Sequence, residues 1–312
     1  MATVGQMGEA ARLSAPRLES GVEAAPAAEG PHITTPENPP QRIIAIDWSG
    51  DKTPTGQRRK IWIADSRNGK VSVANRRTRE ETAEYLIAAA NRNPHLIVGL
   101  DFAFSYPAWF VGEQGCKSAE AFWQLLANGK GEEWLSECRA PFWGRAGRRC
   151  PNDHRAPDWK GFRQTDRRLN ISGIQPKSPF QIGGAGAVGT GSLRGIPILH
   201  QLQGAGFSIW PFTAPGLAVA LEIYPRVFTG KGNKSSLSFR STHLKQPAFA
   251  SLAEKVLTEA RESEDAFDAL CSVIGMKHNA AQFANLQQAT DPTELLEGKI
   301  WQPAAALAPD KA

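Results

Sequence analysis

Carboxylates follow three strand-like apolar segments of this 312-residue chain, and two more occur together at helical spacing. Asp47 follows Ile-Ile-Ala-Ile, Asp101 follows Leu-Ile-Val-Gly-Leu, and Glu222 follows Val-Ala-Leu. Each acid is therefore expected where a buried strand reaches the edge of its sheet. Asp265 and Asp268 are three residues apart, which places both on one face of a helix. Acids are costly to bury unless they are paired or bind a metal, so their convergence on one sheet edge would form a divalent-cation site.

The chemistry that such a site favours is the hydrolysis of phosphodiester bonds. Negative charge develops on the scissile phosphate, and two Mg²⁺ or Mn²⁺ ions about 4 Å apart can hold the attacking water and the leaving oxygen. Hard cations prefer carboxylate oxygens as ligands, and Mg²⁺ keeps several of its waters, so three or four acids are enough. No histidine is needed as a base, which agrees with a chain that contains only six.

Each of these acids also has a plainer structural interpretation. Asp47 begins Asp-Trp-Ser-Gly, a sequence that also forms turns. Asp265 and Asp268 stand near the start of a predicted helix, where acids complement the helix dipole. Glu222 could instead bond the neighbouring Arg226 or a backbone amide. The functional interpretation depends on all of them meeting in space.

One segment carries the basic charge of the chain. Residues 139–168 contain nine Arg or Lys and three Asp, while the net charge of the whole chain is +5, so the remainder is nearly neutral. Cations with interspersed aromatics could follow a nucleic-acid backbone and stack its bases. The alternative is a solvated surface loop whose tryptophans, Trp159 among them, anchor it to the core. The candidate nucleic-acid contacts are Trp143, Arg145, Arg148, Arg149, Lys160, Arg163, Arg167 and Arg168.

Strands and helices alternate along the chain in an order that predicts a mixed α/β sheet flanked by helices. Thr78 and Glu81 form a capping box at the start of the first predicted helix. Residues 108–180 are irregular and rich in tryptophan, which indicates a basic aromatic insertion or lid. Strands are predicted at 42–47, 59–65, 70–75, 96–100, 207–212 and 217–223, and later helices at 196–204, 247–262 and about 264–276, with a glycine-rich stretch at 183–195. Ser263 is the expected N-cap of the last of these helices.

The two ends of the chain differ in composition from the part between them. Residues 1–41 contain six prolines and little aliphatic content, which predicts a disordered tail, or a true start at Met7 or later. Residues 304–312 are expected to be a flexible C-terminus. No secretory signal and no apolar run long enough for a membrane helix is found, so a cytoplasmic protein is expected.

The four cysteines show no metal-binding pattern and no CxxC. Cys138, Cys150 and His154 could be three ligands of a zinc site, but a fourth is missing and the gaps do not fit the usual spacings. Reduced thiols are therefore expected.

Taken in order, the motifs resemble domain-of-unknown-function family 429, whose members are described as predicted RNase H-like nucleases. The resemblance covers about residues 42–303. In the second motif, Ala103 stands where the family commonly has proline, which should change the stiffness of that loop. The motifs are Ile-Asp47-Trp-Ser-Gly50, Gly99-Leu-Asp101-Phe-Ala-Phe-Ser105, Gly186-Ala-Val-Gly189, Leu193-Arg-Gly-Ile-Pro197, Trp210-Pro-Phe, Glu222-Ile-Tyr-Pro225, Asp265-Ala-Phe-Asp268-Ala and Glu297-Gly-Lys-Ile.

This resemblance implies an RNase H-like fold and assigns the acids. Asp47 matches the acid of the first strand and Asp101 that of the fourth strand. Asp265 and Asp268 match the acids of the last helix. These four are the predicted metal ligands for Mg²⁺ or Mn²⁺, and Glu222 joins them as a fifth catalytic candidate that would assist or orient a water.

The prediction is therefore a single RNase H-like domain that hydrolyses DNA or RNA. The alternative is a non-catalytic module of the same fold that binds nucleic acid or acts as a scaffold. Phosphoryl transfer of the sugar-kinase and actin type would need a second such domain, and only one first-strand motif occurs. A dinucleotide site at residues 184–189 lacks the preceding strand and the following acid, and a P-loop motif is absent from the sequence. Oligomeric state is not indicated.

Overall fold

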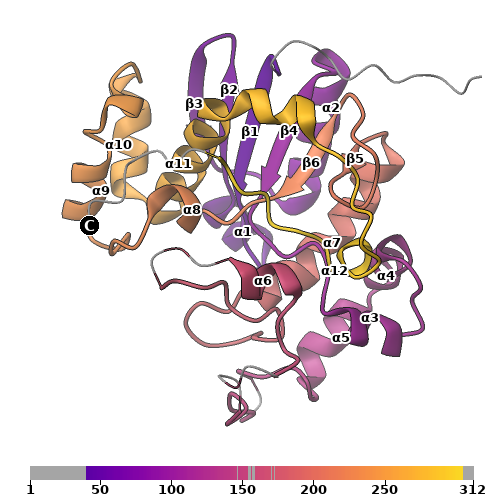
Figure 1. Ribbon diagram of the computed structural model, residues 1–312. Coiled ribbons are helices and arrows are strands. Elements are labelled where there is room, and N and C mark those ends of the chain that lie inside the picture. Colours follow the sequence, from indigo (N-terminus) through magenta and orange to yellow (C-terminus); the bar gives the residue numbers. More distant parts are fainter. Residues whose placement is uncertain are drawn as a thin grey trace, which may run out of the picture. The chain divides into compact units, whose positions relative to one another are not determined.

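The two central strands consist of residues that are apolar on both faces, and they form the middle of a six-stranded mixed sheet (Figure 1). The computed structural model describes residues 40–304, except 146, 154, 155, 157, 158, 170 and 172. The strand order is β3-β2-β1-β4-β6-β5. β2 is antiparallel to β1 and β3, whereas β1, β4, β6 and β5 are parallel. The strands are β1 (Arg42–Asp47), β2 (Trp62–Arg67), β3 (Lys70–Ala74), β4 (Leu96–Leu100), β5 (Ser208–Ile209) and β6 (Val219–Glu222).

Successive side chains of β1 enter two separate hydrophobic clusters, one on each face of the sheet. Ile44 and Ile46 pack with α2 (Arg79–Arg92) and α7 (Gly189–Gly204). Ile43 and Ala45 pack on the opposite face with α11 (Glu264–His278). Gly99 of β4 faces α11, where a Cβ atom would lie 2.7 Å from the sulfur of Met276. The predicted α/β sheet with helical cover is thus confirmed.

The start of the domain follows its local signals closely. Thr78 and Glu81 form the predicted capping box of α2, and strands 42–47 and 96–100 have the predicted bounds. The strand predicted at 59–65 begins later, at Trp62, because α1 (Pro54–Lys60) precedes it. Thr53 caps α1 and Pro54 is its first residue, a start signal that the strand prediction overlooked.

The described part of residues 108–180 is helical in its first half and at one short later helix, while the stretches between and after these helices are irregular as predicted. The buried rings of Trp123 and Trp134 join the cluster that covers one face of the sheet. Ser118 caps the second of these helices by accepting a hydrogen bond from the amide of Ala121. The segment is thus anchored to the core by its aromatic residues. Its helices are α3 (Ala108–Glu113), α4 (Ala119–Ala127), α5 (Lys130–Glu137) and α6 (Gln164–Arg168).

The glycine-rich stretch is partly helical, since α7 begins at Gly189 instead of the predicted residue 196. Glycine is required there by close packing rather than by flexibility. A Cβ atom on Gly195 would lie 2.8 Å from the ring of Phe102. On Gly50 it would lie 2.7 Å from the amide nitrogen of Gly191, in the first turn of α7. This helix start therefore fits directly against the loop that follows β1.

The C-terminal part supplies the helices that cover β1 and β2. The helix predicted at 247–262 is two elements, because the chain turns after residue 249 so that Phe249 and Val256 both reach the core. No described helix is long and apolar enough to cross a membrane. The tail at 1–41 and the C-terminus at 304–312 fall almost wholly outside the described residues. The remaining elements are α8 (Arg226–Thr229), α9 (Leu237–His243), η1 (Pro247–Phe249), α10 (Glu254–Glu262), η2 (Ala280–Asn285) and α12 (Glu294–Glu297).

Candidate active site

Asp47 and Asp101 lie side by side at the ends of two parallel strands. Asp47 is the last residue of β1, and Asp101 directly follows β4. Ile46 pairs with Leu100 in the register of the two strands, and the amide of Asp101 donates a 3.0 Å hydrogen bond to the carbonyl of Ile46. This register confirms the sequence prediction that the two acids meet where neighbouring strands end, at one end of the sheet.

α11 brings the next two acids to the same edge. Ser263 caps this helix as predicted, and its hydroxyl accepts a hydrogen bond from the amide of Ala266. The helix packs across β1 and β2, which places Asp265 and Asp268 over the strand ends. Asp268 is only 1% exposed, whereas Asp265 is partly exposed. Four of the five predicted catalytic acids are thereby gathered into one group, the acidic cluster (Asp47, Asp101, Asp265 and Asp268).

Electrostatics show how closely these carboxylates interact. Burial, followed by repulsion from Asp268, Asp101 and Asp265, raises the pKa of Asp47 well above its ordinary value. Burial raises the pKa of Asp101 to about 8 and that of Asp268 to about 6. These acids thus hold protons more tightly than free carboxylic acids do, because burial disfavours their ionised forms by more than the charge of Lys234 favours them.

Lys234 supplies the positive charge nearest to the acidic cluster. It lies between α8 and α9, and its ammonium forms an ion pair with Asp268 and a longer one, 3.5 Å, with Glu264. Burial lowers the pKa of Lys234, but the charges of Asp268, Asp47 and Asp101 outweigh that effect and raise it. The second oxygen of Asp268, Oδ1, is buried without a hydrogen-bond partner among the described residues.

Lys234 is a residue of this site that the sequence did not indicate. Its surroundings, Lys-Gly-Asn-Lys, resemble an ordinary solvent-exposed loop. Only the folded chain reveals that this lysine reaches an acid 34 residues further along. A local sequence signal for this contact is lacking.

Glu222 ends β6 beside Asp101, but its charge is already neutralised. Both of its oxygens accept hydrogen bonds from the guanidinium of Arg163, at 2.6 and 2.7 Å. The amide of Phe104 donates a further bond to it at 3.0 Å. Arg163 also binds Asp166 through Nη2 at 2.8 Å and through Nε at 3.1 Å. We therefore assign Glu222 to a buried ion-pair group, the Arg163 cluster (Arg163, Asp166 and Glu222), rather than to water activation.

This arrangement corrects the prediction that Arg163 contacts nucleic acid. Its side chain is only 1% exposed, and its donors are directed to Asp166, Glu222 and the carbonyl of Glu297. Burial lowers the pKa of Arg163, but the charges of Asp166 and Glu222 raise it well above the ordinary value overall. A guanidinium held in this way cannot reach a phosphate.

The other predicted nucleic-acid contacts are dispersed rather than aligned. Arg145 donates to the carbonyl of Ile182 at 2.6 Å, Arg167 donates to the carbonyl of Trp159, and Arg168 pairs with Glu294 at 3.0 Å. Trp143 is half-buried against the core. The other three members of the set line a separate pocket: Arg148, Arg149 and Lys160.

A pocket of about 860 Å³ opens at the acidic edge of the sheet. Asp101, Asp265 and Lys234 line one part of it, and we call it the acidic pocket. Another part of its lining is the first turn of α7, where the backbone amides and the helix dipole favour negative charge. Arg145 and Lys177 add cationic side chains to the lining. The pocket thus combines acids suited to a hard cation with donors suited to a phosphate.

No group of three or more His, Cys, Asp or Glu side chains among the described residues is arranged to hold a metal ion. At the acidic cluster, the ammonium of Lys234 binds Asp268, while Asp47 and Asp101 keep carboxylates without ion-pair partners in the described part of the chain. The zinc site considered from the sequence gains no support, since Cys138 is buried and His154 lies outside the described residues.

Comparison with protein-family models found no match, and neither curated proteins nor solved structures matched the chain significantly. Functional inference therefore depends on the residues themselves.

Proposed function

We propose that this protein is an RNase H-like, divalent-metal-dependent phosphodiesterase that acts on nucleic acid. The observation that carries the proposal is the convergence of Asp47, Asp101, Asp265 and Asp268 at the ends of neighbouring strands. Among the described residues, only Lys234 forms an ion pair with this group, through Asp268. The strand arrangement is consistent with the RNase H-like fold, because three antiparallel strands are followed by a fourth that runs parallel to the first.

The donor chemistry of the acidic cluster fits Mg²⁺ or Mn²⁺. Carboxylate oxygens are the ligands that these cations prefer, and the buried Oδ1 of Asp268 has no other partner in the described structure. Asp47, Asp101 and Asp268 would hold the ion, with Asp265 at the open side of the group. A bound ion would lower the pKa of a coordinated water and offset charge on the phosphate.

Other groups of the acidic pocket would orient the substrate and balance its charge. The first turn of α7 and Arg145 would orient the phosphate of the substrate. Lys234 would neutralise Asp268 before the cation binds, and could then place its ammonium near the developing charge. Asp101, with a pKa of about 8, would release its proton when the cation enters.

A second candidate is supported by the position of Lys234. Its ammonium already acts as a cation within the acidic cluster, so the same fold could bind nucleic acid without catalysis. A permanent lysine in that position would compete with a metal ion for the negative charge of Asp268. This binding module remains the alternative.

Cleavage of a panel of nucleic acids distinguishes the two. Duplex, single-stranded, junction and RNA–DNA hybrid substrates are incubated with and without Mn²⁺. We expect Mn²⁺-dependent cleavage that falls at least about 100-fold in Asp47→Asn, because a metal ligand is lost. Glu84→Gln, an exposed acid on α2, is the charge-matched control and should keep full activity. Cleavage that survives in Asp47→Asn with a reduced melting temperature would indicate a purely structural aspartate.

A further inference from the structure

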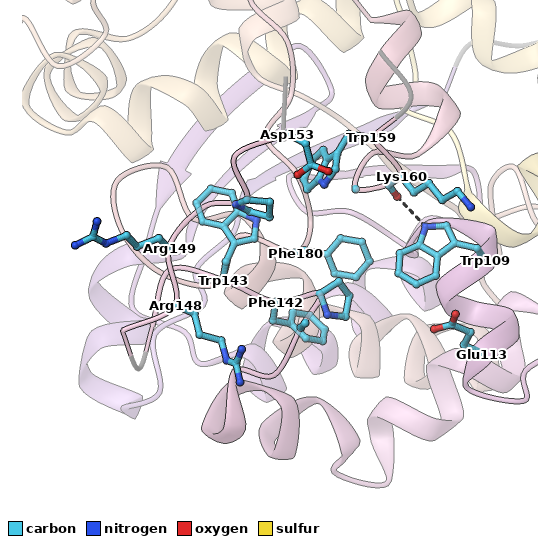
Figure 2. A pocket seen from close by; sticks show the side chains of 14 residues that line it. Trp109, Glu113, Phe142, Trp143, Arg148, Arg149, Asp153, Trp159, Lys160 and Phe180 are labelled. Atoms are coloured by element: carbon cyan, nitrogen blue, oxygen red, sulfur yellow. Dashed lines mark hydrogen bonds between the residues drawn. The ribbon is translucent and has the colours of Figure 1, made fainter. Parts of the chain in front are cut away.

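A second pocket, of about 640 Å³, lies within the segment that follows β4 (Figure 2). Its floor is formed by the buried rings of Phe142 and Phe180. Figure 2 shows Trp109 and Trp143 on opposite sides of Phe180, with Trp159 near the upper edge of the view. All three tryptophans are only partly buried, so aromatic surface remains open to the pocket. We call this site the aromatic pocket.

Cations surround the aromatic surface instead of filling it. Arg148, Arg149 and Lys160 are exposed residues of the lining, and Figure 2 shows Arg149 directed away from the rings. An aromatic interior with cations outside it suits a ligand that has a flat apolar part and a negatively charged part outside the rings. A nucleotide has this division between base and phosphate.

Two exposed carboxylates complete the lining, those of Glu113 and Asp153. Carboxylates accept hydrogen bonds from the amino groups of bases, but they repel phosphate. Their presence therefore argues for an occupant that enters with its base, and against a site for phosphate alone.

The aromatic pocket and the acidic pocket share a wall. Trp143 and Phe180 line the first, and Arg145 and Ile182 line the second. These two short segments run side by side: the amide of Trp143 donates to the carbonyl of Phe180 at 3.1 Å, and the amide of Ile182 donates to the carbonyl of Trp143 at 2.9 Å. A nucleic-acid strand that follows this wall would pass from the lining of the aromatic pocket to the lining of the acidic pocket within two residues of protein chain.

We propose that the aromatic pocket binds an unpaired nucleobase of the nucleic-acid strand whose phosphodiester lies in the acidic pocket. This inference rests on the proposed function, and it adds a substrate class: strands with at least one unstacked, unpaired nucleotide. Paired bases are already stacked within a duplex and cannot present a face to Trp109, Trp143 or Trp159.

Binding measured in EDTA separates this inference from catalysis. Fluorescence anisotropy compares short single strands of RNA and of DNA, the same DNA as a duplex, and an abasic strand of equal length and charge. We expect base-containing single strands to bind about tenfold more tightly than the abasic strand. Trp159→Ala should remove most of that difference, whereas Trp159→Phe should retain it because a stacking ring remains.

A second set of binding measurements tests the arginines of the aromatic pocket. Arg148→Ala combined with Arg149→Ala should weaken all single strands and make their binding less dependent on salt, since phosphate contacts are lost. Arg92→Ala, an exposed arginine at the end of α2, is the matched control and should bind like the unaltered protein.

A crosslinking measurement keeps the test valid if Trp159→Ala fails to fold. Strands that contain a photoreactive halogenated pyrimidine should crosslink to Trp109, Trp143 or Trp159 in the unaltered protein. Equal affinity for abasic and base-containing strands, or crosslinks only outside the aromatic pocket, would overturn the inference. Preferential base binding without any Mn²⁺-dependent cleavage would uphold the base-binding role of the aromatic pocket and contradict the proposed function. Mn²⁺-dependent cleavage without preferential base binding would contradict only the role of the aromatic pocket.

Discussion

Two groups of acids lie at the same end of the sheet, and they are compensated in different ways. In the Arg163 cluster, one guanidinium binds Glu222 and Asp166 with four hydrogen bonds of 2.6 to 3.1 Å. The backbone amides of Phe104 and Arg163 each donate a further hydrogen bond, to Glu222 and Asp166 respectively. Every carboxylate in this group is therefore held in one position.

The acidic cluster has the opposite character. Its four carboxylates have a single ion-pair partner in the described structure, Lys234, and that partner contacts only Asp268 directly. Burial, which the charge of Lys234 offsets only in part, raises the pKa of Asp101 to about 8. An acid with a built-in cation needs no other partner, whereas the acids of the acidic cluster suit the added cation of the proposed function. Asp47, Asp101 and Glu222 all stand at strand ends, so that position alone does not distinguish an acid paired within the protein from an unpaired one.

The largest expected effect comes from removing the compensation of the Arg163 cluster. Arg163→Met leaves two buried carboxylates without a partner and should lower the free energy of unfolding by about 3–5 kcal/mol. Urea denaturation measures this change. Arg168→Met, in the same short helix but with a side chain that is 61% exposed, should cost less than about 1 kcal/mol. Equal stability of the two variants would show that the Arg163 cluster is not a structural element.

A smaller effect is expected when the surplus charge of the acidic cluster is removed. The pKa of Asp101 is raised to about 8, so the folded state holds a proton that the unfolded state releases from about pH 4 upward. In metal-free buffer this residue's contribution to stability is therefore greatest at low pH and is lost as the pH rises toward 8.

Asp101→Asn cannot ionise and should escape that loss. Its melting temperature relative to the unaltered protein should rise between pH 5 and pH 8, by on the order of 5 °C. Thermal unfolding at a series of pH values in EDTA measures the difference, and the shared background from other titrating groups cancels. A melting-temperature difference that stays constant across this range would contradict the uncompensated state of Asp101.

The smallest expected effect concerns the one cation of the acidic cluster. Lys234→Gln removes the ion pair with Asp268 and should lower metal-free stability by about 1–2 kcal/mol, because the lysine is partly exposed. Saturating Mg²⁺ should restore most of that loss if the added ion replaces the missing charge. Denaturation with Mg²⁺ and with EDTA measures both effects. Failure of Mg²⁺ to restore stability would assign the position permanently to lysine and favour the binding module.

Local signals in the sequence predicted those parts of the fold that depend on neighbouring residues. The capping box of Thr78 and Glu81 and the N-cap at Ser263 are both present as predicted, because each is a contact within one helical turn. The apolar runs that end at Asp47 and Asp101 also identified two central strands and the acids that follow them.

Contacts between distant residues could not be predicted in this way. Arg163 and Glu222 are 59 residues apart, and no spacing rule distinguishes Arg163 from the exposed arginines around it. The same is true of Lys234, whose partner lies on another element. The sequence therefore indicated where the acids lie but could not indicate which of them the chain itself neutralises.

Titration with Mn²⁺, followed by electron paramagnetic resonance, measures most directly whether the acidic cluster is a cation site. We expect saturable Mn²⁺ binding in the unaltered protein, loss of that binding in Asp47→Asn, and unchanged binding in Glu84→Gln. An unaltered protein that takes up no Mn²⁺, or an Asp47→Asn variant that binds it equally well, would contradict a cation site at the acidic cluster.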